Sequence, residues 1–206
     1  MRRLLLTATV IWSFHVAYAS GDRVGNGGDV VQCKTSSELL DFYEASEPLK
    51  DFGAKGYKEI LDQVLENLKR LNPSQATQYS RRLQEIYQLI DFKSDVLLTD
   101  VDDSKHLFLP KDKDCKLLQI AIRRNVVSKV TKRFLVNEDL WKALSERSKA
   151  GLIMHEAVYE HFYKLGEDNS SKARILNAYL FSKKATTDSS EDYWGMIKSL
   201  KISIYK

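Results

Sequence analysis

Concentrated basic segments are missing from this chain. Positive and negative charges alternate along it, and the net charge of +4 falls to +2 when Arg2 and Arg3 are left aside. Proteins that bind nucleic acids present a clustered basic surface to the phosphate backbone. We therefore expect no nucleic-acid partner.

Long apolar runs are equally scarce, and the one that stands out lies at the N-terminus. Arg2 and Arg3 precede an uncharged run from Leu4 to Phe14, which is followed by Ala17-Tyr18-Ala19. This run is too short for a bilayer core, which requires about 20 helical residues. A basic start, a short apolar core and a small-residue cleavage site are typical of a secretory signal peptide. We expect residues 1–19 to be removed on export, leaving a periplasmic or secreted protein without a transmembrane segment.

Cysteine occurs only twice, as Cys33 and Cys115. In the oxidising compartment that a signal peptide indicates, an even pair favours a disulfide. Such a bond would close a long loop and stabilise the fold by about 4 kcal/mol through the unfolded state. The alternative is a catalytic thiol, which requires a neighbouring cation or helix N-terminus to stabilise its thiolate. The sequence shows no sign of either, so we predict the disulfide.

The composition is that of a folded domain, with 43% hydrophobic and 29% charged residues. Three- and four-residue apolar spacing predicts helices over 57–71, over 73–90 after the Asn72-Pro73 break, over 137–165 and over 170–184. Short apolar runs predict strands over 96–98, 107–109, 117–122 and 130–136. A capping box is predicted at 35–38, and a last edge strand at 202–205. Residues 20–206 are therefore expected to form a single α+β domain, with helical hairpins packed on a small, mostly antiparallel sheet.

Complete catalytic motifs are also absent. The chain contains no Gly-x-Ser-x-Gly nucleophile elbow. Its closest approach to a catalytic motif is His155-Glu156, which opens like the zincin signature of two histidines four residues apart with a general-base glutamate. Tyr159 occupies the position of the second histidine, and His161 lies about 240° further around the helix. A zinc site would need His155 together with ligands from elsewhere, such as His106 or a carboxylate.

His155 lies on the core-facing stripe of its helix, with Gly151 one turn before it. A small residue at that position allows another backbone to approach closely, such as that of the sheet. One interpretation is a buried structural histidine that is bonded to a backbone carbonyl or a tyrosine. The other is a general base or metal ligand backed by Glu156. The sequence leaves both open.

Glu156 and Glu160 lie four residues apart and share a helix face. Two carboxylates at this spacing could bind a cation or form an acid–base pair, but a solvated helix face is the commoner explanation. If the helices on either side of residues 166–169 form a hairpin, Arg174 lies level with Glu160. We therefore expect an ion pair between Glu160 and Arg174 to lock that hairpin.

Three segments together resemble small, uncharacterised exported proteins of Bdellovibrio-like predatory bacteria. They are the Gly-Asn-Gly-Gly-Asp start at 25–29, the segment Cys115-Lys116-Leu117-Leu118-Gln119-Ile120-Ala121, and the His-Glu-x-x-Tyr helix of residues 155–159. A serine and an arginine further on match Ser170 or Ser171 and Arg174. The resemblance implies a bacterial periplasmic or secreted location, a paired Cys33 and Cys115, and Tyr159 as the family pattern. It implies no particular activity.

The sequence therefore favours an exported protein without catalytic activity, acting in the bacterial envelope as an interaction module. A protein of that envelope would be its partner. The alternative is a metal-dependent or acid–base hydrolase with His155 and Glu156 as its catalytic residues, and with zinc as its cofactor if it uses a metal.

Overall fold

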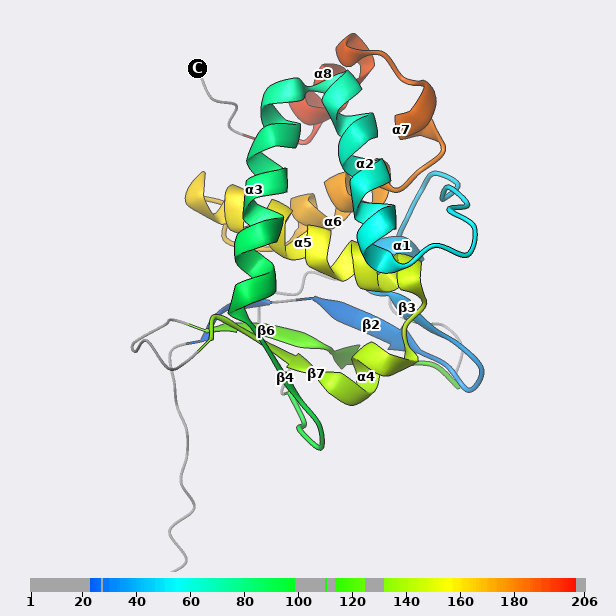
Figure 1. Ribbon diagram of the computed structural model, residues 1–206, viewed down its shortest axis with the longest axis vertical. Helices are drawn as coiled ribbons and strands as arrows, with labels where there is room; N and C mark the ends of the chain where they lie inside the picture. The colour runs from blue at the N-terminus through cyan, green and yellow to red at the C-terminus, as the bar shows by residue number, and fades with distance from the viewer. Residues whose placement is uncertain (1–22, 27, 99–109, 111–113, 125–131, 203–206) are drawn as a thin grey trace, which may run out of the picture.

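A computed structural model describes residues 23–26, 28–98, 110, 114–124 and 132–202 (Figure 1). These residues form eight helices and seven strands, with most of the helices stacked on one side of two small sheets. The α+β class expected from the sequence is confirmed, although the strands form two sheets instead of one. Within the described part of the chain, no helix is both long and apolar enough to cross a bilayer.

Two segments of the chain bend from one sheet into the other. One sheet has the order β1-β6-β7-β4, in which only the β4–β7 pair is parallel, and the other is antiparallel with the order β3-β2-β5. The strands are β1 (Arg23–Asn26), β2 (Asp29–Gln32), β3 (Ser37–Leu39), β4 (Ile90–Lys93), β5 (Lys116–Gln119), β6 (Ala121–Arg124) and β7 (Phe134–Asn137). Ile120 alone separates β5 from β6, so one extended segment passes from the second sheet into the first.

Gly28 forms the matching bend before β2, where the chain comes from β1; these two strands pair with β6 and β5. Its φ is +103°, a conformation that side chains strongly disfavour, and its carbonyl oxygen accepts a hydrogen bond from the Ile120 amide at 3.1 Å. A Cβ atom at this position would lie 2.5 Å from Cδ1 of Leu152. The corner between the sheets therefore requires glycine for its backbone conformation and for close packing against the helix above.

Replacing Gly28 with Ala is expected to lower the free energy of unfolding by about 2–3 kcal/mol, because strain at positive φ adds to a clash with Leu152. Urea denaturation measures the change. Gly53→Ala is the matched control, since Gly53 also has a positive φ, of 67°, but no atom lies within 4 Å of its added Cβ. Equal losses from the two variants would show that the close packing at Gly28 contributes nothing.

The first helical hairpin agrees with the sequence. It consists of α2 (Tyr57–Leu71) and α3 (Pro73–Leu89), with Asn72 between them. The Asn72 side chain caps α3 by accepting a hydrogen bond from the Gln75 amide at 3.1 Å. Both helices place their apolar stripes against α5 (Glu146–Lys164).

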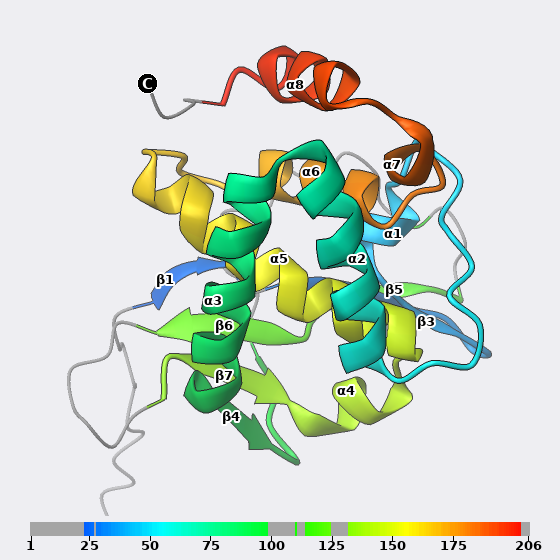
Figure 2. The same cartoon turned by 45° about the horizontal axis from the view of Figure 1, so that its top comes forward.

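The helix α5 lies at the centre of the molecule, between the α2–α3 hairpin and the sheets (Figures 1 and 2). It is buried on all sides over most of its length, from Ala150 to Phe162. The helix expected over 137–165 is in fact two, since α4 (Glu138–Ala143) ends before Ser145. Ser145 has an extended backbone, and its hydroxyl caps α5 by accepting a hydrogen bond from the Ser148 amide.

Other local expectations need correction. No capping box forms at 35–38; those residues lead into β3, and the one-turn helix α1 (Leu40–Tyr43) follows directly. Residues 96–98 are not a strand, and β4 lies earlier, immediately after α3. The remaining helices are α6 (Ser171–Leu180), α7 (Lys184–Thr187) and α8 (Ser190–Ser199). The strands predicted at 107–109 and 202–205 lie wholly or almost wholly outside the described residues.

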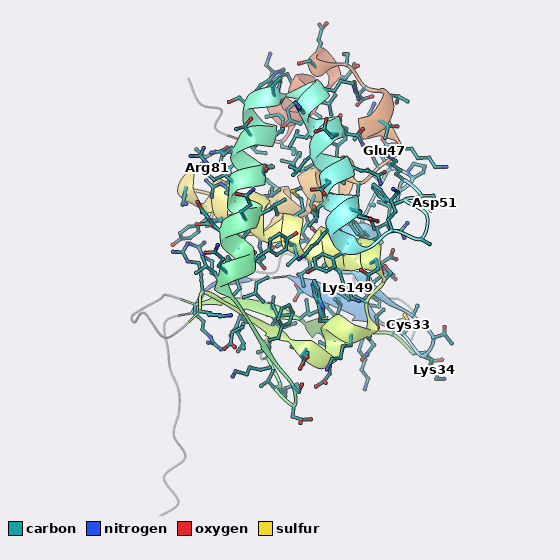
Figure 3. All side chains as sticks on the ribbon, viewed as in Figure 1. Cys33, Lys34, Glu47, Asp51, Arg81 and Lys149 are labelled. Atoms are coloured by element: carbon teal, nitrogen blue, oxygen red, sulfur yellow. A yellow bond between two sulfur atoms is a disulfide. The ribbon has the colours of Figure 1, made fainter. Side chains whose placement is uncertain are left out.

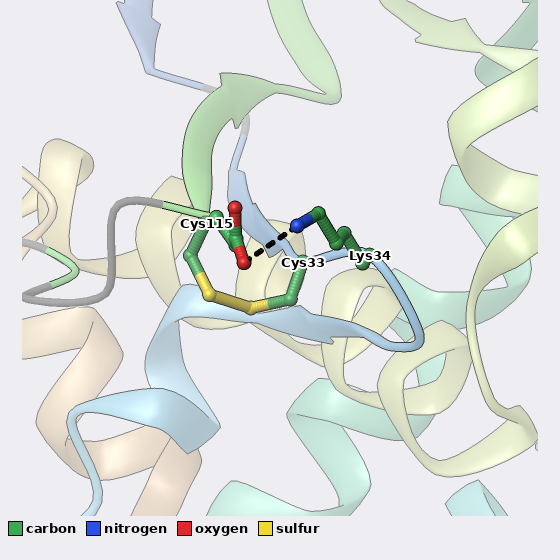
Figure 4. Close-up of a disulfide and its surroundings, with 4 residues drawn as sticks. Cys33, Lys34 and Cys115 are labelled. Atoms are coloured by element: carbon green, nitrogen blue, oxygen red, sulfur yellow. Dashed lines mark hydrogen bonds and ion pairs between the residues drawn. A yellow bond between two sulfur atoms is a disulfide. The ribbon is translucent and has the colours of Figure 1, made fainter.

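Cys33 and Cys115 form the predicted disulfide (Figure 4). The bond joins the end of β2 to the start of β5 across 82 residues of chain. An ion pair between Lys34 and Asp114, with 2.8 Å between Nζ and Oδ2, lies beside it at the exposed edge. The disulfide therefore fastens the edge of the second sheet, where two antiparallel strands enter their loops.

Candidate functional site

Most charged side chains lie at the surface, as Glu47, Asp51 and Arg81 do in Figure 3. A small group around α5 is buried instead. His155 is 1% exposed and Glu156 is 3% exposed. Burying a charge is costly unless it is paired, so the partners of these side chains decide what the group can do.

His155 forms a buried ion pair with Asp41 of α1. The distance between His155 Nδ1 and Asp41 Oδ2 is 2.8 Å, and both side chains are inaccessible to solvent. The same carboxylate oxygen accepts a hydrogen bond from the Asn177 amide of α6 at 2.7 Å. The partner of His155 is thus a carboxylate, and neither the backbone carbonyl nor the tyrosine suggested by the sequence. The Tyr159 ring packs at 6.0 Å from the imidazole.

Gly151 allows α1 to reach this position. A Cβ atom on Gly151 would collide with the Phe42 ring of α1 and lie 2.8 Å from Cδ2 of Leu39. The Gly151 carbonyl oxygen also accepts a hydrogen bond from the Asn177 amide at 2.9 Å. A close approach to Gly151 therefore occurs, but it is made by the side chains of Phe42 and Leu39 and not by another backbone, as the sequence had suggested.

A second buried ion pair joins α1 to α6. Arg174 Nε donates to Glu44 Oε2 at 2.8 Å, and its guanidinium also donates to the Ser170 hydroxyl at 2.8 Å. Asp41 and Glu44 are three residues apart on α1 and its C-cap, and Arg174 and Asn177 are three residues apart on α6. The two segments therefore meet through two contacts, Asp41 with Asn177 and Glu44 with Arg174. We call these four residues the α1–α6 ladder.

The expected ion pair between Glu160 and Arg174 is replaced by other partners. Arg174 faces α1, while Glu160 lies near Arg133 at 2.8 Å, Lys164 at 3.0 Å and Arg82 at 3.7 Å. The prediction that Glu156 and Glu160 lie on a solvated helix face is also wrong, because α3 and the sheet cover that face. Glu160 is a paired structural carboxylate.

The charges of the His155–Asp41 pair stabilise each other. Burial lowers the pKa of His155, but the adjacent Asp41 carboxylate outweighs this effect and raises the pKa to about 9. For Asp41, burial acts to raise the pKa. The charge and hydrogen bond of His155 outweigh this effect, so the pKa of Asp41 lies below its usual value. At neutral pH the pair is therefore imidazolium and carboxylate.

Glu156 has a different environment. Burial raises its pKa to about 8, against the opposing charges of His155 and Arg123. Neither of its carboxyl oxygens has a hydrogen-bond partner among the described residues. Glu156 is therefore mainly protonated at neutral pH, and it does not orient His155 as a general-base partner would.

These pKa shifts predict a fall in stability as the pH rises. Unfolding lets Glu156 ionise near its usual pKa of 4.5 and His155 lose its proton near 6.5, whereas in the fold both retain their protons to about 8 and 9. Stability is therefore lost from about pH 4.5 to about pH 8 through Glu156, and from about pH 6.5 to about pH 9 through His155, as the unfolded state releases protons that the fold retains. If Glu156→Gln is as stable as the wild type at about pH 4, it should exceed the wild type at about pH 8 in urea denaturation. If the free energies of unfolding of Glu156→Gln and the wild type differed by the same amount at both pH values, the raised pKa of Glu156 would be contradicted.

A pocket of about 140 Å³ borders Asp41, Glu44 and Arg174. Its lining does not include His155 or Glu156. Solvent therefore reaches the edge of the α1–α6 ladder, while the two candidate catalytic residues lie behind it.

A zinc site around His155 is not assembled from the described residues. Among them, no group of three or more His, Cys, Asp or Glu side chains could hold a metal ion. His106, the other histidine considered as a ligand, lies outside the described residues. The Nδ1 atom of His155 is occupied by Asp41, so we derive no step through zinc.

The sequence indicated His155, Glu156, Tyr159, Glu160 and Arg174 but missed their partners. Asp41 interrupts the apolar run Leu39-Leu40-Asp41-Phe42-Tyr43, and a lone charge in such a run is the signal that could have revealed it. Asn177 similarly interrupts the apolar run of α6.

Compared with protein-family models, curated proteins and solved structures, the chain shows no significant match. The function of the chain is therefore inferred from the geometry of its residues.

Proposed function

We propose that this chain is an exported protein of the bacterial envelope that acts by binding and carries no catalytic activity. The signal-like residues 1–19 and the resemblance to exported bacterial proteins support export. The Cys33–Cys115 disulfide is compatible with an oxidising compartment outside the cytoplasm.

The burial of His155 is the observation that carries the proposal of a non-catalytic role. A general base must come within hydrogen-bond distance of the proton that it removes from a substrate. His155 is 1% exposed, and its Nδ1 atom is engaged by Asp41. Its Nε2 atom is buried as well, with no hydrogen-bond partner among the described residues. The group therefore has the properties of an internal brace between α1, α5 and α6.

The strongly shifted pKa of Glu156 favours the alternative of an acid–base or metal-dependent hydrolase, since such shifts cluster at active sites. The two hypotheses predict different results for purified protein. A brace predicts that His155→Gln lowers the unfolding temperature and that no hydrolysis of ester, peptide or glycoside substrates depends on His155. Stoichiometric bound zinc, or turnover that His155→Gln abolishes, would contradict a non-catalytic role.

Export is tested by expressing the full chain in a Gram-negative bacterium and measuring the intact mass of the protein released by osmotic shock. We expect a mature protein that begins at Ser20 and contains no free thiol. Ala19→Arg is the matched variant, because a large charged residue blocks a small-residue cleavage site. A cytoplasmic protein that retains Met1 in both forms would contradict export.

A further inference from the structure

Four positively charged side chains gather where α3, the end of α5 and the β6–β7 pair meet. Arg82 belongs to α3, Arg123 to β6 and Lys164 to the last turn of α5. Arg133 immediately precedes β7. We call these four side chains the cation cluster. They come from separate segments of the chain, so the fold creates a concentration of positive charge that the sequence does not show as a basic run.

Three members of the cation cluster point to one carboxylate. Arg133 Nη1 donates to Glu160 Oε1 at 2.8 Å. Lys164 Nζ lies 3.0 Å from the same oxygen, and Arg82 Nη1 lies 3.7 Å from Glu160 Oε2. These cations therefore converge on one small region instead of spreading over a face of the molecule.

Arg123 approaches the same face of α5 from the sheet. The carbon of its guanidinium group lies 4.7 Å from the centre of the Tyr163 ring. Burial raises the pKa of Glu156 and the Arg123 charge opposes this rise, so Arg123 lies near both side chains. Glu156, Glu160 and Tyr163 are four and three residues apart on α5 and share a helix face. Arg123 therefore lies along the face that carries Glu160.

The positive charge of the cation cluster exceeds the negative charge around it. Among the described residues, Glu160 is the only carboxylate that forms an ion pair with any of the four. Glu156 is mainly protonated at neutral pH. The carbonyl groups at the end of α5 supply about half a negative charge. Four positive charges thus face about one and a half negative ones, and their mutual repulsion is relieved if an anion binds.

The neighbouring His161 is sensitive to this positive potential. Burial, together with the charges of Arg82 and Lys164, lowers the pKa of His161 to about 4. The imidazole is therefore neutral at physiological pH and adds no further positive charge. The uncompensated charge belongs to the arginines and the lysine.

The cation cluster also has more hydrogen-bond donors than Glu160 can use. A guanidinium group has five N–H donors and an ammonium group has three. Arg133 uses one of its five donors on Glu160. Arg82 Nε and Arg123 Nη1 are buried and have no hydrogen-bond partner among the described residues. Acceptors are therefore in short supply at this place.

Two members of the cation cluster are open to solvent. The side chain of Arg133 is 35% exposed and that of Lys164 is 54% exposed, whereas Glu160 is 8% exposed. A ligand that arrives from solvent therefore meets the two cations before it meets the carboxylate. Arg82, at 11% exposed, adds its charge from behind them.

These features favour a compact anion with several acceptor oxygens. The guanidinium group matches carboxylate and phosphate oxygens in geometry. A carboxylate brings one negative charge, whereas a phosphate group brings about 1.5 to 2 at neutral pH and three strong acceptor oxygens. The excess charge of the cation cluster is therefore better matched by phosphate. Its convergence on Glu160 fits a single group better than an extended membrane surface.

We propose that the cation cluster binds the phosphate group of a small soluble molecule. Arg133 and Lys164 donate to the phosphate oxygens from the exposed side, and Arg82 and Arg123 contribute their charges from the interior. Glu160 holds the cations in place beneath the ligand. This site goes beyond the proposed function, and it stands whether or not the chain is exported or has catalytic activity.

Titration of the full chain with inorganic phosphate tests the proposal. The ionic strength is held constant with chloride, because salt screens exposed charges. Backbone amide shifts of residues 123, 133 and 160–164 should change saturably, with a Kd of about 1 mM. Acetate, which brings a single charge, should bind at least about tenfold more weakly.

Two lysines provide a matched pair of variants. Lys164 pairs with Glu160, and Lys142 of α4 pairs with Glu138; each lysine follows its carboxylate by four residues, at 3.0 Å, and each is more than half exposed. Lys164→Gln should weaken phosphate binding at least about tenfold, the loss expected for a charge-assisted hydrogen bond. Lys142→Gln should leave the Kd unchanged. Arg133→Gln should weaken binding as Lys164→Gln does.

Four results would overturn the proposal. They are the absence of a saturable shift, binding of acetate as tight as that of phosphate, equal losses from Lys164→Gln and Lys142→Gln, and shifts confined to other parts of the chain. Sedimentation with phosphatidylglycerol vesicles without saturable binding of inorganic phosphate would assign the cation cluster to a membrane surface, and would overturn it as well.

Discussion

Replacing Asp41 with Asn is expected to lower the free energy of unfolding by about 3–5 kcal/mol, because it leaves the His155 imidazolium buried without its counter-charge. The substitution preserves the size of the side chain and changes only its charge and one acceptor. Urea denaturation at neutral pH measures the loss. The pKa of His155 should fall at the same time, because the carboxylate that raises it is gone.

Asp62→Asn is the matched control for this prediction. Asp62 is exposed on α2, so the same chemical change should leave the stability of the fold nearly unaltered. A double-mutant cycle of Asp41→Asn with His155→Gln isolates the coupling between the two side chains. A coupling close to zero, or a loss no larger than that of Asp62→Asn, would show that the ion pair does not brace α1 against α5.

Replacing both Cys33 and Cys115 with Ala is expected to lower the free energy of unfolding by about 4 kcal/mol. The bond closes a loop of 82 residues, and its removal gives the unfolded chain back the conformational freedom of that loop. Chemical denaturation of the purified double variant and the oxidised wild type measures the difference. Reduction of the wild type should reproduce most of the loss.

Lys34→Ala is the control for local effects at this site. It removes the exposed ion pair with Asp114 beside the disulfide, and exposed pairs contribute little to stability. If Lys34→Ala destabilised the protein as much as loss of the disulfide, the effect would belong to the loop edge and not to the covalent bond.

Local signals were sufficient for the α2–α3 hairpin and the disulfide. The apolar spacing of α2 and the Asn72-Pro73 break depend on neighbouring residues, and the structure places both helices within one residue of the predicted ends. The cysteine pair followed from the expected compartment and from their number. These features require no knowledge of which distant elements meet.

The environment of α5 could not be predicted in this way. An amphipathic pattern assumes that one face of a helix meets solvent, but α5 is covered by the hairpin on one side and by the sheets and α6 on the others. Glu156 and Glu160 therefore lie inside the protein, although their spacing is typical of a solvated face. Only the tertiary arrangement shows this.

The partners of His155 and Arg174 were missed for a related reason. Asp41 of α1 lies 114 positions before His155 in the sequence. Glu44, the C-cap of α1, lies 130 positions before Arg174. Sequence reasoning paired Arg174 with Glu160 because the two are close along a hairpin. The structure pairs it with Glu44 because α6 presents that side to α1.

The buried state of His155 is the central claim of this account, and the ring nitrogens of His155 report on it directly. Long-range ¹H–¹⁵N spectra recorded from about pH 5 to about pH 10, with His155→Gln used to assign the signals, give its protonation state. We expect an imidazolium that persists through neutral pH, titrates near 9 and exchanges its Nδ1 proton slowly with water. A His155 ring that titrates near 6.5 and exchanges rapidly would place it in contact with solvent, and would contradict its assignment as an internal brace.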